Sequence, residues 1–180
     1  MRGSRRVAVA FTLALLACSA AAPAAAVPAK ASKLRLTSPA FKDGGLIPDG
    51  FTCDGANASV PLRWRGVPKG TVELALTMED PDTPIGTFVH WVVWSLDPKA
   101  GGIPEQTVPA GVQEGKNGTG AIGYRGPCPP PGAGQHRYRF TLYALDEELT
   151  LAPGATIDEL RAAMQGTVVA KTRFVGRYGR

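Results

Sequence analysis

Three segments with the residue pattern of β-strands dominate the sequence and restrict the folds open to it. From Val72 to Asp80, apolar and polar residues alternate, which is typical of a strand with one buried face. Thr87 to Leu96 is apolar on both faces, as expected for a central strand covered on both sides. A third strand is predicted from Arg137 to Leu145. The chain is therefore expected to be mostly β.

The rest of the chain adds shorter strands, one helix and long loops. The 22 glycines and 16 prolines favour a loop-rich β protein over a helical bundle. Short strands are predicted at Leu34–Thr37, Leu62–Trp64 and Val168–Phe174. A helix is predicted to start after Thr156, which can cap it, and to end at Gly166. Because no repeat or linker divides residues 34–180, we expect one β-sandwich-like domain with a helix near the C-terminus.

The N-terminus has the three-part pattern of an export signal. Arginines at positions 2, 5 and 6 precede an apolar run of 11 residues, which is shorter than the about 20 residues that span a bilayer. Ala24-Ala25-Ala26 then fits a cleavage site, so residues 1–26 are predicted to be a signal peptide and 27–33 a flexible lead-in. In the alternative, Leu15-Leu16-Ala17-Cys18 acts as a lipobox and anchors the protein through Cys18. No later segment is apolar enough to cross a membrane.

The charge of the chain argues against nucleic-acid binding. The full chain has a formal net charge of +5, and removal of the three N-terminal arginines lowers it to +2. Four of the remaining cations lie near the C-terminus rather than along a broad stripe. A nucleic-acid partner would require such a stripe, so none is expected.

Two cysteines, Cys53 and Cys128, remain after signal cleavage. In an oxidising compartment such a pair is a candidate disulfide, and the alternative is two free buried thiols. Two cysteines far apart in sequence do not make a zinc site by themselves, and the chain has no C-x-x-C motif. No metal site and no cofactor are predicted.

Strand parity suggests a polar pocket that contains the two histidines of the chain. Asp80 and His136 have the parity of the apolar residues in their own strands, and His90 has that of Val92 and Trp94. Buried charged groups need partners, so the simplest arrangement is that these three side chains partner one another. The alternative is that each histidine is a satisfied structural residue of the core.

Short motifs spread over the whole domain resemble a known family. In order along the chain they are Asp80-Pro81-Asp82-Thr83-Pro84, His90-Trp91, Gly126-Pro127-Cys128-Pro129-Pro130-Pro131 and His136-Arg137-Tyr138. Together they resemble the signature of the phosphatidylethanolamine-binding protein family. Flanking segments, which include Ser38–Phe41, Cys53–Asn57, Pro61–Trp64 and Leu142–Asp146, are similar to its bacterial, Raf kinase inhibitor-like branch. The resemblance extends from Leu34 to Tyr178.

This resemblance implies a fold and a set of site residues. The fold would be a large antiparallel sheet packed on a smaller one, with an anion pocket that accepts phosphate, acetate or a phosphoethanolamine head group. The implied ligand-binding residues are Asp80, Asp82, His90, Pro130, His136 and Tyr138. In such a site the histidines and the tyrosine donate to phosphate oxygens, and Asp80 orients a histidine. Because charged histidines donate from both ring nitrogens, anion affinity is expected to fall as pH rises through the histidine range.

The function expected from the sequence is binding without catalysis. A hydrolase that uses the histidines and aspartates is an alternative, although the chain has no H-E-x-x-H and no G-x-S-x-G motif. A secreted protease inhibitor is a second alternative, because relatives in the family carry inhibitor names. The expected partner is thus a small anion or phospholipid head group, with a protease as the alternative partner, and the expected location is outside the cytoplasm.

Overall fold

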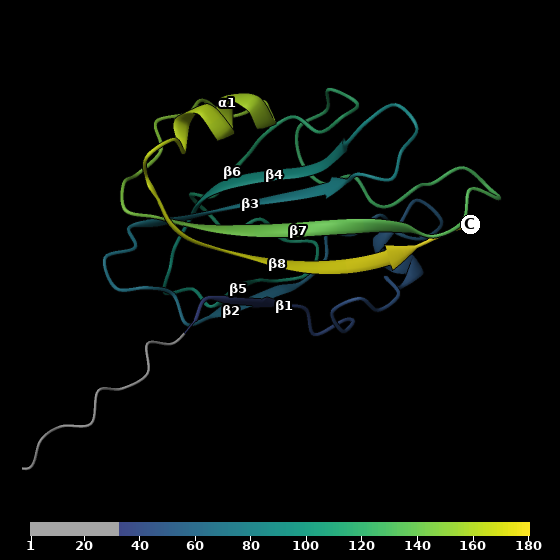
Figure 1. The fold of residues 1–180 in the computed structure, drawn as a ribbon, viewed down its shortest axis with the longest axis horizontal. Helices are drawn as coiled ribbons and strands as arrows, with labels where there is room; N and C mark the ends of the chain where they lie inside the picture. The colour runs from purple at the N-terminus through teal and green to yellow at the C-terminus, as the bar shows by residue number, and fades with distance from the viewer. Residues whose placement is uncertain (1–32) are drawn as a thin grey trace, which may run out of the picture. The chain divides into compact units, whose positions relative to one another are not determined.

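The computed structural model describes residues 33–180. They form two antiparallel sheets and one short α-helix, shown in Figure 1. The predicted signal peptide, nearly all of the lead-in at 27–33 and the alternative anchor residue Cys18 lie outside the described residues. No helix in the described part of the chain is long and apolar enough to span a bilayer.

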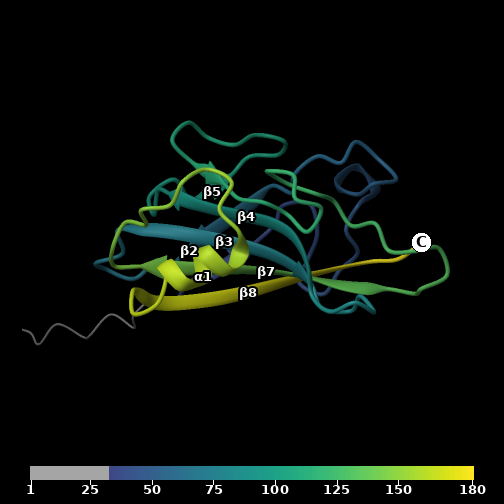
Figure 2. The same cartoon turned by 90° about the horizontal axis from the view of Figure 1, so that it is seen from above.

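The large sheet has five strands in the order β6-β4-β3-β7-β8, and every neighbouring pair is antiparallel. Its strands are β3 (Glu73–Asp80), β4 (Phe88–Leu96), β6 (Gln113–Glu114), β7 (His136–Leu145) and β8 (Val168–Tyr178). Figure 2 shows β8 beside β7 at one edge of this sheet. The three strong strands predicted from the sequence form its centre, with bounds that differ by one residue or less.

The small sheet has three strands in the order β1-β2-β5. They are β1 (Arg35–Thr37), β2 (Leu62–Arg65) and β5 (Gly102–Ile103), and a 3-10 helix, η1 (Asp49–Phe51), lies between β1 and β2 in the chain. In Figure 1 the large sheet lies between this small sheet below and the helix α1 (Ile157–Ala163) above. The predicted antiparallel sandwich-like domain, with a large and a smaller sheet and a C-terminal helix, is therefore confirmed.

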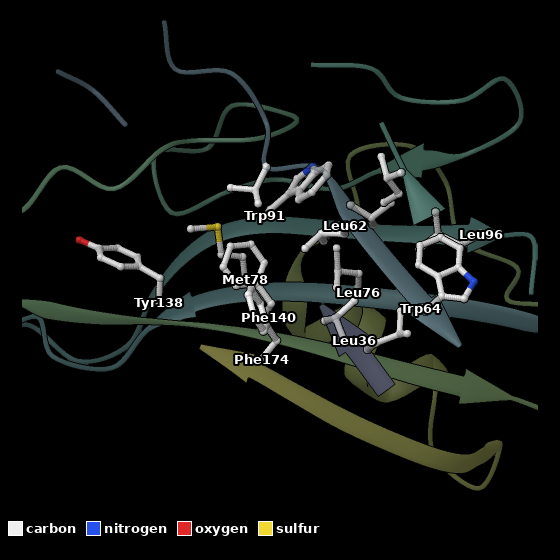
Figure 3. Packing of buried hydrophobic residues seen from close by; sticks show 14 of the residues in the cluster. Leu36, Leu62, Trp64, Leu76, Met78, Trp91, Leu96, Tyr138, Phe140 and Phe174 are labelled. Atoms are coloured by element: carbon white, nitrogen blue, oxygen red, sulfur yellow. The ribbon is translucent and has the colours of Figure 1, made fainter. Parts of the chain in front are cut away.

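The main hydrophobic core fills the space between the two sheets. Every second side chain along β3, β7 and β8 points into this core, among them Leu76, Phe140 and Phe174. They pack with Leu36 and Trp64 of the small sheet (Figure 3). Burial of these apolar side chains is the dominant favourable contribution to folding. The alternation in the sequence thus identifies the residues of β3 that face this core. The prediction that β3 has only one buried face is wrong, because Ala75 and Thr77 on its other face are also buried.

The opposite face of the large sheet packs against α1. Val92 and Trp94 of β4 are buried there with Leu160 of the helix. The helix begins with a capping box, in which Thr156 Oγ1 accepts from the Glu159 backbone N–H and the Glu159 carboxylate accepts from the Thr156 N–H. The predicted start is confirmed, whereas the last helical residue is Ala163, three residues before the predicted end at Gly166.

Candidate functional site

Asp80 and His136 meet at one end of the large sheet. Asp80 is the last residue of β3, and His136 is the first residue of the antiparallel neighbour β7. The Nδ1 atom of His136 lies 2.7 Å from Oδ2 of Asp80, and both residues are buried. The second carboxylate oxygen of Asp80 accepts from the backbone N–H of Asp82 at 2.8 Å. Because both oxygens are hydrogen-bonded, the burial of this carboxylate is compensated.

A β-bulge in β4 brings His90 to the same side of the sheet. Met78 pairs with Trp91 and Glu79 pairs with Val89, so His90 has no partner on β3. An extra residue of this kind reverses the alternation of the strand. His90 therefore faces the pocket with Asp80, although Val92 and Trp94, which share its parity, pack under α1.

His90 is buried and is held by a backbone carbonyl. Its Nδ1–H donates to the carbonyl oxygen of Arg125 at 2.7 Å. Burial lowers the pKa of His90 to about 4, against a smaller raising effect of the Arg125 hydrogen bond. At pH 7 the ring is therefore neutral, and Nε2 carries a lone pair. For His90 this differs from the sequence-based expectation of a charged, doubly donating imidazole.

Tyr138 places an unpaired hydroxyl at the pocket. Its ring is buried on β7 and packs edge-on against His90, with ring centroids 5.1 Å apart. The hydroxyl has no hydrogen-bond partner in residues 33–180. Figure 3 shows it directed away from the packed side chains of the core. Burial raises the pKa of Tyr138, so the group remains a donor at physiological pH.

Asp82 lies next to the pocket but does not line it. Its carboxylate accepts from the backbone N–H of Arg137 at 2.8 Å and from the Arg137 guanidinium at 2.9 and 2.5 Å. These hydrogen bonds lower the pKa of Asp82 to about 2. The structure thus brings together five of the six predicted ligand-binding residues around the pocket. Asp82 lies beside them and binds Arg137, the residue after His136.

One wall of the pocket comes from the proline-rich segment. Cys128, Pro129 and Pro130 line it, and Cys128 forms a disulfide with Cys53. The predicted disulfide is confirmed, and the alternative of two free thiols is wrong. Because the link joins the wall to the segment after η1, it fixes one side of the pocket.

The pocket has a volume of about 310 Å³ and includes residues that were not predicted from the sequence. Arg125 is the most informative of them, because it is exposed and no carboxylate of the described chain lies within 4 Å of its guanidinium. Phe88, which packs against the His90 ring, also lines the pocket, together with Thr119 and residues 83–85. Arg125 lies in a loop without periodicity, and its position directly before Gly126-Pro127-Cys128 is the one signal that could have identified it. Residues 33–180 hold no group of three side chains suited to a metal ion.

Comparison with known proteins identifies the family. The family model described as "Phosphatidylethanolamine-binding protein" matches residues 37–179. The chain belongs to this family. The resemblance inferred from the sequence motifs is therefore confirmed, and the phosphatidylethanolamine-binding protein fold accounts for the two sheets.

Several relatives of the phosphatidylethanolamine-binding protein family are similar over most of the chain. A UPF0098 protein of Methanothermobacter thermautotrophicus is 44% identical over 82% of this chain and 99% of its own length. LppC of Mycobacterium tuberculosis, which is named as a lipoprotein, is 44% identical over 86% of this chain and 77% of its own.

Two solved structures of the family have the same fold. The homologue CT736 from Chlamydia trachomatis has a TM-score of 0.79 at 37% identity and covers 83% of this chain and 99% of its own. YbcL of Escherichia coli has a TM-score of 0.76 at 28% identity and covers 82% of this chain and 99% of its own.

Proposed function

We propose that this protein binds a small anion or the phosphate-containing head group of a phospholipid in the histidine pocket, and that it does so without catalysis. The main support is the Tyr138 hydroxyl, a buried donor that the described chain leaves unpaired. An unsatisfied buried polar group costs about 1–3 kcal/mol, so a ligand that accepts this hydrogen bond recovers that cost.

The other groups of the pocket suit an anion that also carries a hydrogen-bond donor. The Arg125 guanidinium supplies a positive charge that the described carboxylates do not neutralise within 4 Å. The Asp80 carboxylate is occupied by His136 and by the Asp82 N–H. Phosphate oxygens accept from Arg125 and Tyr138, and the Nε2 lone pair of His90 accepts from an ammonium group or a protonated phosphate oxygen.

We propose further that the protein acts outside the cytoplasm. The N-terminal signal pattern and the Cys53–Cys128 disulfide support export. The lipoprotein name of LppC supports a lipid anchor at Cys18 as the alternative. Mass spectrometry of the protein from an exporting host distinguishes the two: we expect a mature chain that starts near residue 27, and a diacylated Cys18 would overturn that expectation.

Calorimetric titration with phosphoethanolamine tests the binding proposal. Tyr138→Phe removes one hydroxyl and keeps the ring, so we expect affinity to fall about tenfold, the effect of one lost hydrogen bond to a charged group. Tyr124→Phe is the matched control, because its hydroxyl donates to the Phe51 carbonyl and does not line the pocket. Equal affinities of the wild type and Tyr138→Phe would place the binding site elsewhere. Turnover of the ligand during the titration would favour the hydrolase alternative.

A further inference from the structure

The outer face of the large sheet carries a second pocket, which shares no lining residue with the histidine pocket. It has a volume of about 270 Å³ and lies beside α1, on the face opposite the main core. Its lining is dominated by charged and hydroxyl-bearing side chains, among them Glu79, Arg139, Thr141, Tyr143, Arg161 and Arg173.

The strand register brings two of these arginines close together. Arg139 of β7 pairs with Val175 of β8, and Arg173 lies two residues before Val175 on the same face. Diagonal neighbours of this kind have Cα atoms about 7–8 Å apart, which lets two long side chains reach a common point. Arg139 is half-buried, so its charge is partly removed from water.

The single carboxylate in the pocket is already occupied. Oε1 of Glu79 accepts from the Arg161 guanidinium at 2.6 Å, and Oε2 accepts from the Thr77 hydroxyl at 3.2 Å. No Asp or Glu in residues 33–180 lies within 4 Å of the guanidinium of Arg139 or Arg173. Three arginines and one glutamate give the lining a formal charge of +2. Neighbouring like charges repel, so the pocket favours a counter-anion.

We propose that this arginine pocket is a second anion site, and that it takes a phosphate group, either as free phosphate or as a phosphomonoester. Guanidinium groups form paired hydrogen bonds with phosphate oxygens, and two of them from adjacent strands clamp one tetrahedral anion. The hydroxyls of Thr141 and Tyr143 supply further donors at the wall. The site faces away from the histidine pocket, and its binding of phosphate is independent of the function proposed for that pocket.

The test follows the Nε–Hε resonances of the arginine side chains by NMR at low ionic strength. Inorganic phosphate and glycerol 3-phosphate are titrated separately, and the Arg139 and Arg173 resonances are expected to shift in a saturable way. Tighter binding of the ester would identify a phosphorylated metabolite as the ligand, and tighter binding of the free ion would identify phosphate itself. Unshifted Arg139 and Arg173 resonances with both probes would overturn the proposal.

Arg139→Gln and Arg173→Gln are each expected to weaken this binding about tenfold or more, because each removes a charge-assisted hydrogen-bond donor. Lys171→Gln is the matched control: it removes one positive charge from the same face of β8, and Lys171 does not line the pocket. An equal loss in the Lys171 variant would show that the effect is general electrostatic attraction, and would contradict the proposal. If a glutamine variant fails to fold, the titration of the wild-type protein still tests the proposal through the Arg139 and Arg173 resonances.

Discussion

Burial controls the charge of individual residues around the histidine pocket. His90 gains a hydrogen bond from its Nδ1–H to the Arg125 carbonyl but loses water around the ring, and the loss of water is the larger effect on its pKa. The same loss of water raises the pKa of Tyr138. At pH 7 both residues are therefore neutral, and the positive charge at the pocket mouth comes from Arg125.

The protonation of His90 makes stability depend on pH. Its pKa is about 4 in the folded protein and 6.5 in the reference state, so between these values the unfolded chain binds the extra proton. Stability should therefore decrease as pH falls from 6.5 towards 4, by roughly 3 kcal/mol from this group. Urea denaturation at a series of pH values measures the effect.

His90→Asn is the control for that prediction. The asparagine amide can still donate to the Arg125 carbonyl, but it does not titrate. The variant should lose part of the decrease in stability between pH 6.5 and 4, while other groups contribute equally to both proteins. Parallel pH profiles of the two proteins would show that His90 does not titrate in this range.

At the level of elements, periodicity predicts the strands well and the orientation of His90 poorly. The alternation in β3 identifies the side chains that face the main core, because Glu73 to Glu79 pair in regular sequence with β7. In β4, alternation alone would place His90 with Val92, on the face under α1. The extra residue at the bulge reverses this, and single-strand periodicity contains no information about the partner strand. The sequence placed the two histidines in one pocket by parity and by the family motifs, and for His90 the parity argument assigned the wrong face of β4.

The short helix α1 depends on its first turn. Thr156→Ala removes the hydroxyl that accepts from the Glu159 N–H, and we expect a loss of about 1 kcal/mol in the free energy of unfolding. Chemical denaturation of the variant measures it, with Thr150→Ala in the exposed preceding loop as the control. If both variants are as stable as the wild type, the capping box does not stabilise the helix measurably.

For the whole molecule, the proline-rich wall is tied to the segment around η1 by several links. Beside the disulfide, Asn57 Oδ1 accepts from the Gly126 N–H at 2.7 Å, and the Tyr124 hydroxyl donates to the Phe51 carbonyl at 2.8 Å. These contacts join parts of the chain about 70 residues apart. The disulfide could be predicted because the N-terminal signal pattern indicates export to an oxidising compartment. The two hydrogen bonds could not be predicted, because they join loops in which the residue pattern has no periodicity.

Loss of the disulfide should destabilise the domain strongly. The Cys53–Cys128 link spans 75 residues, and a closed loop of that length corresponds to about 4 kcal/mol in the chain-entropy model. The Cys53→Ser, Cys128→Ser double variant is therefore expected to unfold at a lower urea concentration. Thiol labelling of denatured, unreduced wild type should find neither cysteine reactive, and two labelled cysteines would disprove the link.

The unpaired residue in β4 means that the pocket is encoded by residue count as well as by residue type. Upstream of position 90 the side chains of β4 alternate in one phase relative to β3, and from Trp91 to Trp94 they alternate in the other. If β4 had no extra residue at the bulge, the imidazole of His90 would lie on the face of Trp94 and α1, away from Asp80. Transfer of the site to another β-sandwich therefore requires this local change of phase along with the histidines.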